Sequence, residues 1–328
     1  MIDLHTHILP PSLPEMRRLT GYGGWVEYEP SESGCQRMVI DGKAFRVIEP
    51  NCCEAGARLE DMARHGVATQ ALSTVPVMFS YWAQAAHAHD LARVLNDHIA
   101  EVVRSHPGRF VGLGTLPMQD ARLAVKELRR CLSDLGMRGV QIGSHVNGAN
   151  LDDPALFDVL EAAQELGAAV FVHPWDMLAR DRMQRHWLPW LVGMPAETAL
   201  AAASLTMGGV LERLPRLKVC LAHGGGAYPW IIGRVDHAWH IRPDLCATAS
   251  ASSPAAQLRR FFFDSLVHDA AALRCLLEVA GVERVALGTD YPFPLGEETP
   301  GTLIRGLGLE AATEARLLEG TAREFLVL

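Results

Sequence analysis

The sequence predicts a closed (β/α)8 barrel, in which eight parallel strands alternate with helices around a central core. Eight short apolar runs alternate with longer segments whose apolar residues recur every three or four positions. Gly136, Gly167 and Gly281 lie where a helix would end before the next strand. The chain has 328 residues, and α/β barrels routinely exceed 200 residues as one domain. An open doubly wound sheet has the same alternation, so periodicity leaves it as the alternative fold.

The elements follow one another along the chain in a regular order, with two interruptions. The predicted strands cover residues 2–7, 69–74, 110–115, 139–142, 169–173, 218–223, 261–264 and 284–288, and helical spacing covers 91–105, 121–135, 154–166 and 270–279. Residues 20–50 contain an Asp41-Gly42 pair between short β-like runs, a hairpin signal. A second irregular stretch, 175–195, carries three tryptophans. We therefore predict one domain over residues 1–328, with residues 20–50 as a small β insertion after strand 1.

Composition and charge indicate a globular cytoplasmic enzyme. The net charge of −8 makes the chain a poor partner for nucleic acid or anionic lipid. No apolar run approaches the roughly 18 residues of a membrane helix, and MIDLHTHILP lacks the pattern of a signal peptide. The cysteines are odd in number and form no CxxC motif, so we expect reduced thiols at positions 35, 52, 53, 131, 220, 246 and 275.

Metal-binding and proton-exchanging residues recur where the predicted strands end. His5 and His7 lie two apart on strand 1, so their side chains share one face. His173 ends strand 5, His223 ends strand 6, and Asp290 follows strand 8. An HxH pair alone is equally typical of hydrogen-bonded loop histidines. Barrel active sites are built at the carboxyl ends of the strands, so the coincidence of four strand ends predicts a functional centre.

Three imidazoles and one carboxylate suit Zn²⁺, with nickel, cobalt and iron as competitors. We assign His5, His7, His173 and Asp290 as ligands of one Zn²⁺, with His223 and Asp290 as the catalytic candidates. His223 would exchange a proton with a water on the metal. The residues alone leave open which of His173 and His223 is the ligand.

Neighbouring residues refine this hypothesis. Strand 4 lacks the lysine that bridges the metals of many two-metal barrels, which favours a single metal. His145, just beyond that strand, is more typical of a loop histidine than of a ligand. Asp264 ends strand 7 and could support the site from behind. From residue type alone, we expect Arg46 and Arg234 to be solvated surface charges. We expect Trp187 and Trp190 to pack rather than to contact substrate.

Longer blocks of sequence resemble a known family. The strand 1 HxH, HPWDM at 173–177, LPWLVGMPAET at 188–198, AHGGG at 222–226 and GTDYPFPLGE at 288–297 resemble the amidohydrolase superfamily. GYGGW at 21–25, DGKAFRV at 41–47 and STVPVMFSYWA at 73–83 narrow the resemblance to its zinc decarboxylases. The similarity extends over essentially the whole chain.

The resemblance implies a specific reaction and site. It implies a (β/α)8 barrel with one Zn²⁺ per chain and the ligand set given above, with His223 as the essential histidine that is not a ligand. It further implies a homodimer in which Arg46 and the neighbouring subunit's copy of Arg234 bind substrate carboxylates, and a substrate site lined by Trp190. Ile40 stands where vertebrate members are expected to carry lysine, which puts an additional cationic contact there in doubt.

The reaction implied by the resemblance is the non-oxidative decarboxylation of 2-amino-3-carboxymuconate 6-semialdehyde to 2-aminomuconate 6-semialdehyde in tryptophan degradation. Two carboxylates call for bidentate cations, which explains arginine rather than lysine. Hydroxide addition and direct protonation remain alternative routes. Another decarboxylase of the superfamily, a metal-dependent lactone or amide hydrolase, and a non-enzymatic zinc-bearing scaffold remain alternative functions.

Overall fold

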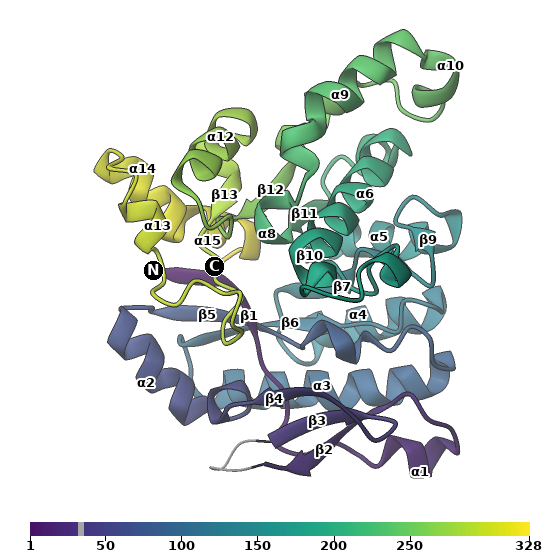
Figure 1. Cartoon of the computed structure of the whole chain (residues 1–328), viewed down its shortest axis with the longest axis vertical. Coiled ribbons are helices and arrows are strands. Elements are labelled where there is room, and N and C mark those ends of the chain that lie inside the picture. The colour runs from purple at the N-terminus through teal and green to yellow at the C-terminus, as the bar shows by residue number, and fades with distance from the viewer. Residues whose placement is uncertain (32–35) are drawn as a thin grey trace.

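Eight parallel strands form the central sheet of the computed structural model, which describes residues 1–31 and 36–328 (Figure 1). In spatial order they are β1 (Ile2–His7), β5 (Thr69–Ser73), β6 (Phe110–Thr115), β7 (Gly139–Gly143), β10 (Ala169–His173), β11 (Lys218–Leu221), β12 (Phe261–Asp264) and β13 (Val285–Ala286). The first and last strands of this order, β1 and β13, lie next to each other and close the barrel. At this junction Leu4 N–H donates to the Leu287 carbonyl over 2.9 Å, and Thr6 forms a parallel β-bridge with Tyr291. The predicted barrel is therefore confirmed over the doubly wound sheet.

Two strands end two residues earlier than the sequence predicts. Strand β11, the sixth of the predicted barrel strands, stops at Leu221 because His223 and Gly224 adopt positive φ values of 56° and 60°, which turn the chain sharply. Strand β13, the eighth of the predicted barrel strands, covers only Val285–Ala286. Beyond it, the chain passes so close to its neighbours that a Cβ at Gly288 would lie 2.7 Å from the Cβ of Asp264. Both departures occur at the barrel end that carries the candidate residues.

Helices cover the outside of the barrel. The longer ones are α2 (Ala55–His65), α3 (Ala85–Ser105), α4 (Ala121–Ser133), α5 (Pro154–Glu165), α6 (Met194–Met207), α9 (Tyr228–Ile241) and α12 (Ala270–Ala280). The shorter ones are α1 (Met16–Thr20), α7 (Val210–Arg213), α8 (Ala222–Gly225), α10 (Pro243–Cys246), α11 (Pro254–Gln257), α13 (Thr302–Arg305), α14 (Ala311–Ala315) and α15 (Thr321–Leu326). Asp120, Asp153 and Asp269 each accept a hydrogen bond from the first turn of the helix that follows, which fixes where α4, α5 and α12 begin.

The inserted segment after strand 1 forms a separate antiparallel sheet. Its strands are β2 (Val26–Pro30), β3 (Gln36–Ile40) and β4 (Lys43–Ile48). Asp41 and Gly42 have positive φ values of 50° and 73°, as the predicted two-residue hairpin turn requires. Residues 32–35 of this segment, including the thiol predicted at Cys35, lie outside the described residues. One further short hairpin joins β8 (His145–Val146) to β9 (Ala149–Asn150).

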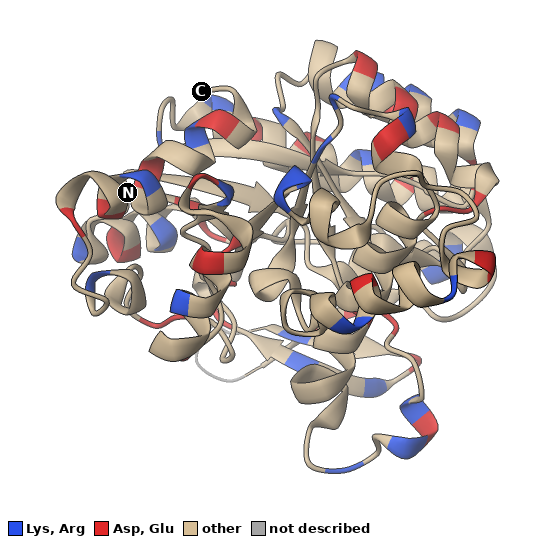
Figure 2. Ribbon diagram, turned by 90° about the horizontal axis from the view of Figure 1, so that it is seen from above, with Lys and Arg blue, Asp and Glu red and all other residues tan. Residues whose placement is uncertain are grey.

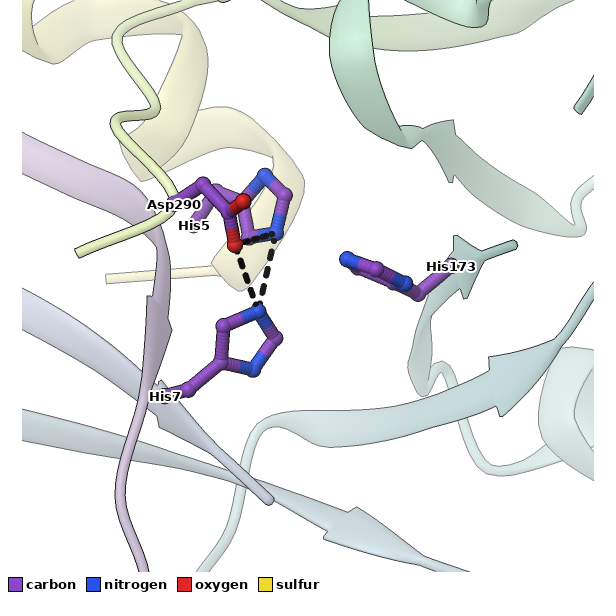
Figure 3. A group of neighbouring side chains, drawn as sticks. All are labelled: His5, His7, His173 and Asp290. Atoms are coloured by element: carbon purple, nitrogen blue, oxygen red, sulfur yellow. Dashed lines mark hydrogen bonds and ion pairs between the residues drawn. The ribbon is translucent and has the colours of Figure 1, made fainter. Parts of the chain in front are cut away.

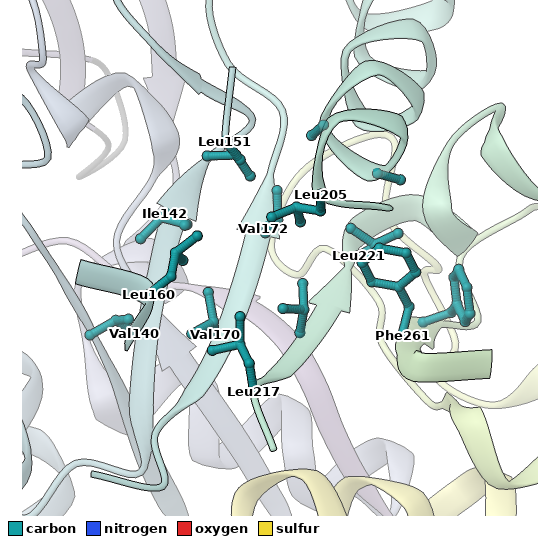
Figure 4. Close-up of a cluster of buried hydrophobic side chains, with 14 of the residues drawn as sticks. Val140, Ile142, Leu151, Leu160, Val170, Val172, Leu205, Leu217, Leu221 and Phe261 are labelled. Carbon is teal, nitrogen blue, oxygen red and sulfur yellow. The ribbon is translucent and has the colours of Figure 1, made fainter. Parts of the chain in front are cut away.

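The largest apolar core lies between the strands and the helices of the second half of the barrel. Figure 4 shows side chains of β7, β10 and β11 packed against Leu160 of α5 and Leu205 of α6. A second cluster joins Ile2, Leu4 and Phe171 to Phe325 of α15. This cluster fills the amino-terminal end of the barrel, so the candidate site lies at the opposite end.

The outer surface carries mixed charge. Figure 2 shows basic and acidic residues interspersed along the outer helices. Within the described part of the chain, no helix combines the length and apolar character needed to span a membrane. Helices α9 and α10 project away from the barrel (Figure 1).

Candidate metal centre

Four buried side chains from two strands and one loop converge at the carboxyl end of the barrel (Figure 3). Their possible ligand atoms, on His5, His7, His173 and Asp290, all lie within 4.8 Å of one another. The Nε2 atoms of His5 and His7 are 3.2 Å apart, and the Asp290 Oδ1 lies 2.9 Å from His7 Nε2. His173 points toward this group from the other side of the site. The structure thus brings together all four residues predicted as ligands.

The histidines are oriented by contacts on their outward nitrogens. His5 Nδ1 lies 2.7 Å from Asp264 Oδ2, and His7 Nδ1 lies 2.9 Å from the Thr74 carbonyl. His173 Nδ1 lies 2.9 Å from the carbonyl of Pro174. A proton on each Nδ1 would satisfy these acceptors and leave each Nε2 lone pair directed into the site, as in most metal-binding histidines.

The electrostatics of the group favour a divalent cation. His173 Nε2 is buried without a hydrogen-bond partner in the described structure. Burial lowers the pKa of His7, and burial together with neighbouring imidazoles holds the pKa of His173 well below its ordinary value. Burial alone would raise the pKa of Asp290, but its contacts with His223, His5 and His7 hold it well below that of a free aspartate. Burial alone would lower the pKa of His5, but its hydrogen bond with Asp264 and the charge of Asp290 raise it. The neutral imidazoles of His7 and His173 beside the ionised Asp290 carboxylate are donors that such a cation needs.

His223 faces this group from the turn after β11. Its Nε2 lies 3.8 Å from Asp290 Oδ2, and its Nδ1 is buried without a partner in the described structure. The positive φ of His223 is strained for a side chain of this size. Two backbone hydrogen bonds hold the turn: His223 N–H and Gly224 N–H donate to the Asp264 carboxylate over 2.8 and 2.7 Å. His223 therefore lies beside the four-residue group, in position to exchange a proton.

A cavity of about 400 Å³ opens above this group. Its floor contains His7, His173, His223 and Asp290, and its apolar walls include six aromatic side chains: Phe45, Trp175, Trp187, Trp190, Trp230 and Phe293. The Arg46 guanidinium, from β4 of the insertion, lies 4.2 Å from the centre of the Phe293 ring and forms no ion pair with any described residue. The described lining of the cavity thus offers one arginine and apolar walls.

The remaining predicted residues have different locations. Trp190 and Trp187 both line the cavity, and Trp187 is 42% exposed. Residue type alone predicts a packing role for both. Arg234 is exposed on α9 and does not line the cavity of its own chain. Ile40 packs in the insertion rather than in the cavity. His145 is directed to the Asp176 carbonyl, 3.0 Å away, in keeping with a loop histidine.

Several contributors carry no sequence signal. The Thr74 and Pro174 carbonyls that orient two histidines are backbone atoms that any residue would supply. Phe45 and Phe293 line the cavity because β4 and the loop after β13 meet across it. Only Asp264 could be anticipated, from its place at the end of strand 7.

Comparisons with known proteins agree with this architecture. The model of the amidohydrolase family (Amidohydro_2) matches residues 2–328. The 2-amino-3-carboxymuconate-6-semialdehyde decarboxylase of Dictyostelium discoideum is 54% identical over 100% of this chain and 91% of its own length. The enzyme of that name from Caenorhabditis elegans is 42% identical over 92% of this chain and 88% of its own.

Solved structures share the fold. The 5-carboxyvanillate decarboxylase of Sphingomonas paucimobilis superposes with a TM-score of 0.84 at 26% identity, covering 100% of this chain and 99% of that one. A dihydroxybenzoic acid decarboxylase from Polaromonas, solved with manganese and an inhibitor, gives a TM-score of 0.80 at 22% identity, covering 100% and 96%. The chain therefore belongs to the amidohydrolase family and is one of its carboxy-lyases.

Proposed function

We propose that this enzyme uses Zn²⁺ to decarboxylate 2-amino-3-carboxymuconate 6-semialdehyde, yielding 2-aminomuconate 6-semialdehyde in tryptophan degradation. The observation that carries the proposal is the cavity itself. It combines the histidine–aspartate group with His223, which lies outside that group, and with Arg46, which forms no ion pair with any described residue. The two relatives named for this reaction support the choice of substrate.

The residues suit the chemistry of a flat, doubly carboxylated substrate. Arg46 would bind one carboxylate in bidentate fashion, and the aromatic walls would hold the conjugated chain flat. A divalent cation held by His5, His7, His173 and Asp290 would supply Lewis acidity. When the carbon–carboxylate bond breaks, the electron pair stays on the carbon and the conjugated system stabilises it. His223 would then deliver a proton to that carbon, so one CO2 leaves for each proton taken up.

Metal analysis and a direct assay test this function together. The purified chain would be stripped with a chelator, reloaded separately with Zn²⁺ or Mn²⁺, and given freshly generated substrate while CO2 is measured. We expect one metal per chain, the highest activity with zinc, and one CO2 per substrate consumed. Zinc binding with only the slow spontaneous decay of the substrate would contradict the proposed reaction. Cleavage of lactones or esters without CO2 would favour the hydrolase alternative.

We also propose that the active form is a homodimer in which Arg234 completes the partner's cavity. Among the described residues that line the cavity, Arg46 is the only arginine or lysine, yet a doubly charged substrate calls for a second cation. Exposed apolar side chains extend from the cavity rim on the 187–192 segment to α6 and outward along α9 and α10: Trp187, Leu191, Val192, Leu200, Trp230, Ile231, Ile241 and Leu245. A second copy covering these side chains would bring Arg234 of α9 toward its neighbour. A cytoplasmic location is part of the same proposal, supported by six described cysteines without a disulfide.

Mixing two inactive variants tests the shared site. Arg46→Met and Arg234→Met should each lose most activity, because each leaves one substrate carboxylate without its cation. If both chains contribute, each mixed dimer regains one intact site, so an equimolar mixture should recover about one quarter of parental activity. Native mass spectrometry would verify that mixed dimers have formed. Mixed dimers without recovered activity would show that Arg234 does not act across the interface.

A further inference from the structure

Arg58, on α2, is a fully buried arginine that forms no ion pair with any described residue. Its side chain points from the outer helix layer toward the carboxyl end of β1. An arginine in such a place is costly to desolvate, and an apolar side chain of similar size would fill the space without that cost. The contacts of its guanidinium therefore need an explanation beyond packing.

The guanidinium contacts four separate acceptors around the end of β1. Its NH1 donates to the His7 carbonyl over 2.6 Å and to the Asn51 carbonyl over 3.0 Å. Its NH2 donates to Thr6 Oγ1 over 3.0 Å, and its Nε donates to Gln70 Oε1 over 3.2 Å. Two of these acceptors belong to β1 itself, one of them on His7, whose imidazole is in the candidate metal group.

The Arg58 guanidinium also packs against the ring of Tyr291, the residue after Asp290. The guanidinium carbon of Arg58 lies 4.8 Å from the centre of the Tyr291 ring. The Tyr291 hydroxyl donates to Asp61 Oδ2 over 2.6 Å, which attaches the same tyrosine to α2 a second time. Arg58 thus touches both segments that carry candidate ligands at this side of the site.

These two segments meet at the seam between the first and last strands of the barrel. Regular strand pairing is short here, since β13 has only two residues. The seam continues through His7 N–H, which donates to the Tyr291 carbonyl, and Asp290 N–H, which donates to the His5 carbonyl, each over 2.8 Å. Three of the four candidate ligands therefore depend on the alignment of this seam.

We propose that Arg58 is a positioning residue for the metal centre: it clamps the end of β1 against the Asp290–Tyr291 segment and so sets the separation of His7 and Asp290. The proposal rests on the metal centre proposed above. Arg58 does not line the cavity, so it acts on the ligands from behind and touches no substrate.

The test compares Arg58→Met with Arg260→Met, both made in the full-length chain. Arg260 is a matched control, because it also donates to backbone carbonyls, those of Leu211 and Pro215, but outside the candidate site. The metal-free proteins would be titrated with Zn²⁺ against a chromophoric chelator, and kcat and KM would be measured at saturating zinc. Thermal unfolding of the metal-free proteins would record any general loss of stability.

We expect Arg58→Met to bind Zn²⁺ about 10- to 100-fold more weakly than the parent, as for other residues that orient metal ligands from behind. Its kcat should fall while KM stays close to the parental value, because Arg46 is untouched. Arg260→Met should keep parental zinc affinity whatever its loss of stability. Equal zinc affinity in Arg58→Met and the parent would overturn the clamp alone, whereas a parent chain that binds no zinc would overturn the metal centre and the clamp with it.

A second variant covers the case in which Arg58→Met does not fold. Arg58→Lys keeps the charge but replaces the guanidinium fork with a single ammonium, which cannot reach the His7, Thr6 and Gln70 acceptors together. Weaker zinc binding by this folded variant would support the clamp, and unchanged zinc affinity would overturn it.

Discussion

Replacing His223 with asparagine should lower kcat for decarboxylation by about 10²- to 10⁴-fold, the usual contribution of a general acid or base. His223 faces the metal group but lies 3.8 Å from Asp290 Oδ2 and has no place among the four converging ligand atoms. Asparagine suits the position, because it tolerates the positive φ of 56° better than most residues do. The turn should therefore persist, and the bound metal should remain at the parental level.

The measurement pairs kcat at saturating substrate with metal content by mass spectrometry. His145→Asn is the matched control, since it replaces a histidine that lies outside the described lining of the cavity and should leave kcat unchanged. Parental activity in His223→Asn would show that the proton comes from elsewhere. Loss of metal along with activity would show instead that His223 is a ligand, the assignment that the residues alone left open against His173.

The location of the candidate site could be predicted because strand periodicity and barrel geometry act together. Alternation places His5 and His7 on one face of β1, and parallel strands bring their carboxyl ends together, so His173 and Asp290 had to lie near them. The orientation of each imidazole could not be predicted, because the carbonyls of Thr74 and Pro174 supply it and any residue has a carbonyl.

Long-range packing explains the other omissions. Arg58 gives no sign of its role in the sequence, where it stands within an ordinary amphipathic helix. Only the fold brings its guanidinium to Thr6 and His7, about fifty positions earlier in the chain. The early end of β13 likewise depends on how closely Gly288 passes Asp264. Local sequence propensity cannot predict this distance, because the two residues are brought together by the fold.

The second large effect is expected at Asp264, because its carboxylate contacts both the metal-ligand candidate His5 and the turn that carries His223. It lies 2.7 Å from His5 Nδ1 and accepts hydrogen bonds from the backbone of His223, Gly224 and Leu266. Burial alone would raise the pKa of Asp264, but the hydrogen bond with His5 and the charges of His5 and His223 lower it below its ordinary value. Asp264 is therefore ionised at neutral pH and accepts from every one of these partners.

Asp264→Asn should consequently reduce both metal binding and proton transfer. An amide has one acceptor oxygen, so its NH2 group would face a donor and at least one backbone hydrogen bond would be lost. We expect zinc affinity to fall about 10- to 100-fold and the free energy of unfolding to fall by about 2–4 kcal/mol. Decarboxylation should remain impaired even at saturating zinc, because the turn that carries His223 has lost part of its anchor.

Asp269→Asn provides the comparison for this variant. Asp269 accepts from Ala272 N–H at the start of α12, five positions further along the chain, and asparagine caps helices about as well as aspartate. Zinc titration, urea unfolding and kcat would be measured for both variants. Full kcat at saturating zinc in Asp264→Asn would mean that the carboxylate orients His5 alone and that the His223 turn is held by its glycines. Deficits in both zinc affinity and zinc-saturated kcat, absent from Asp269→Asn, would show that the metal ligand and the proton donor share one anchor.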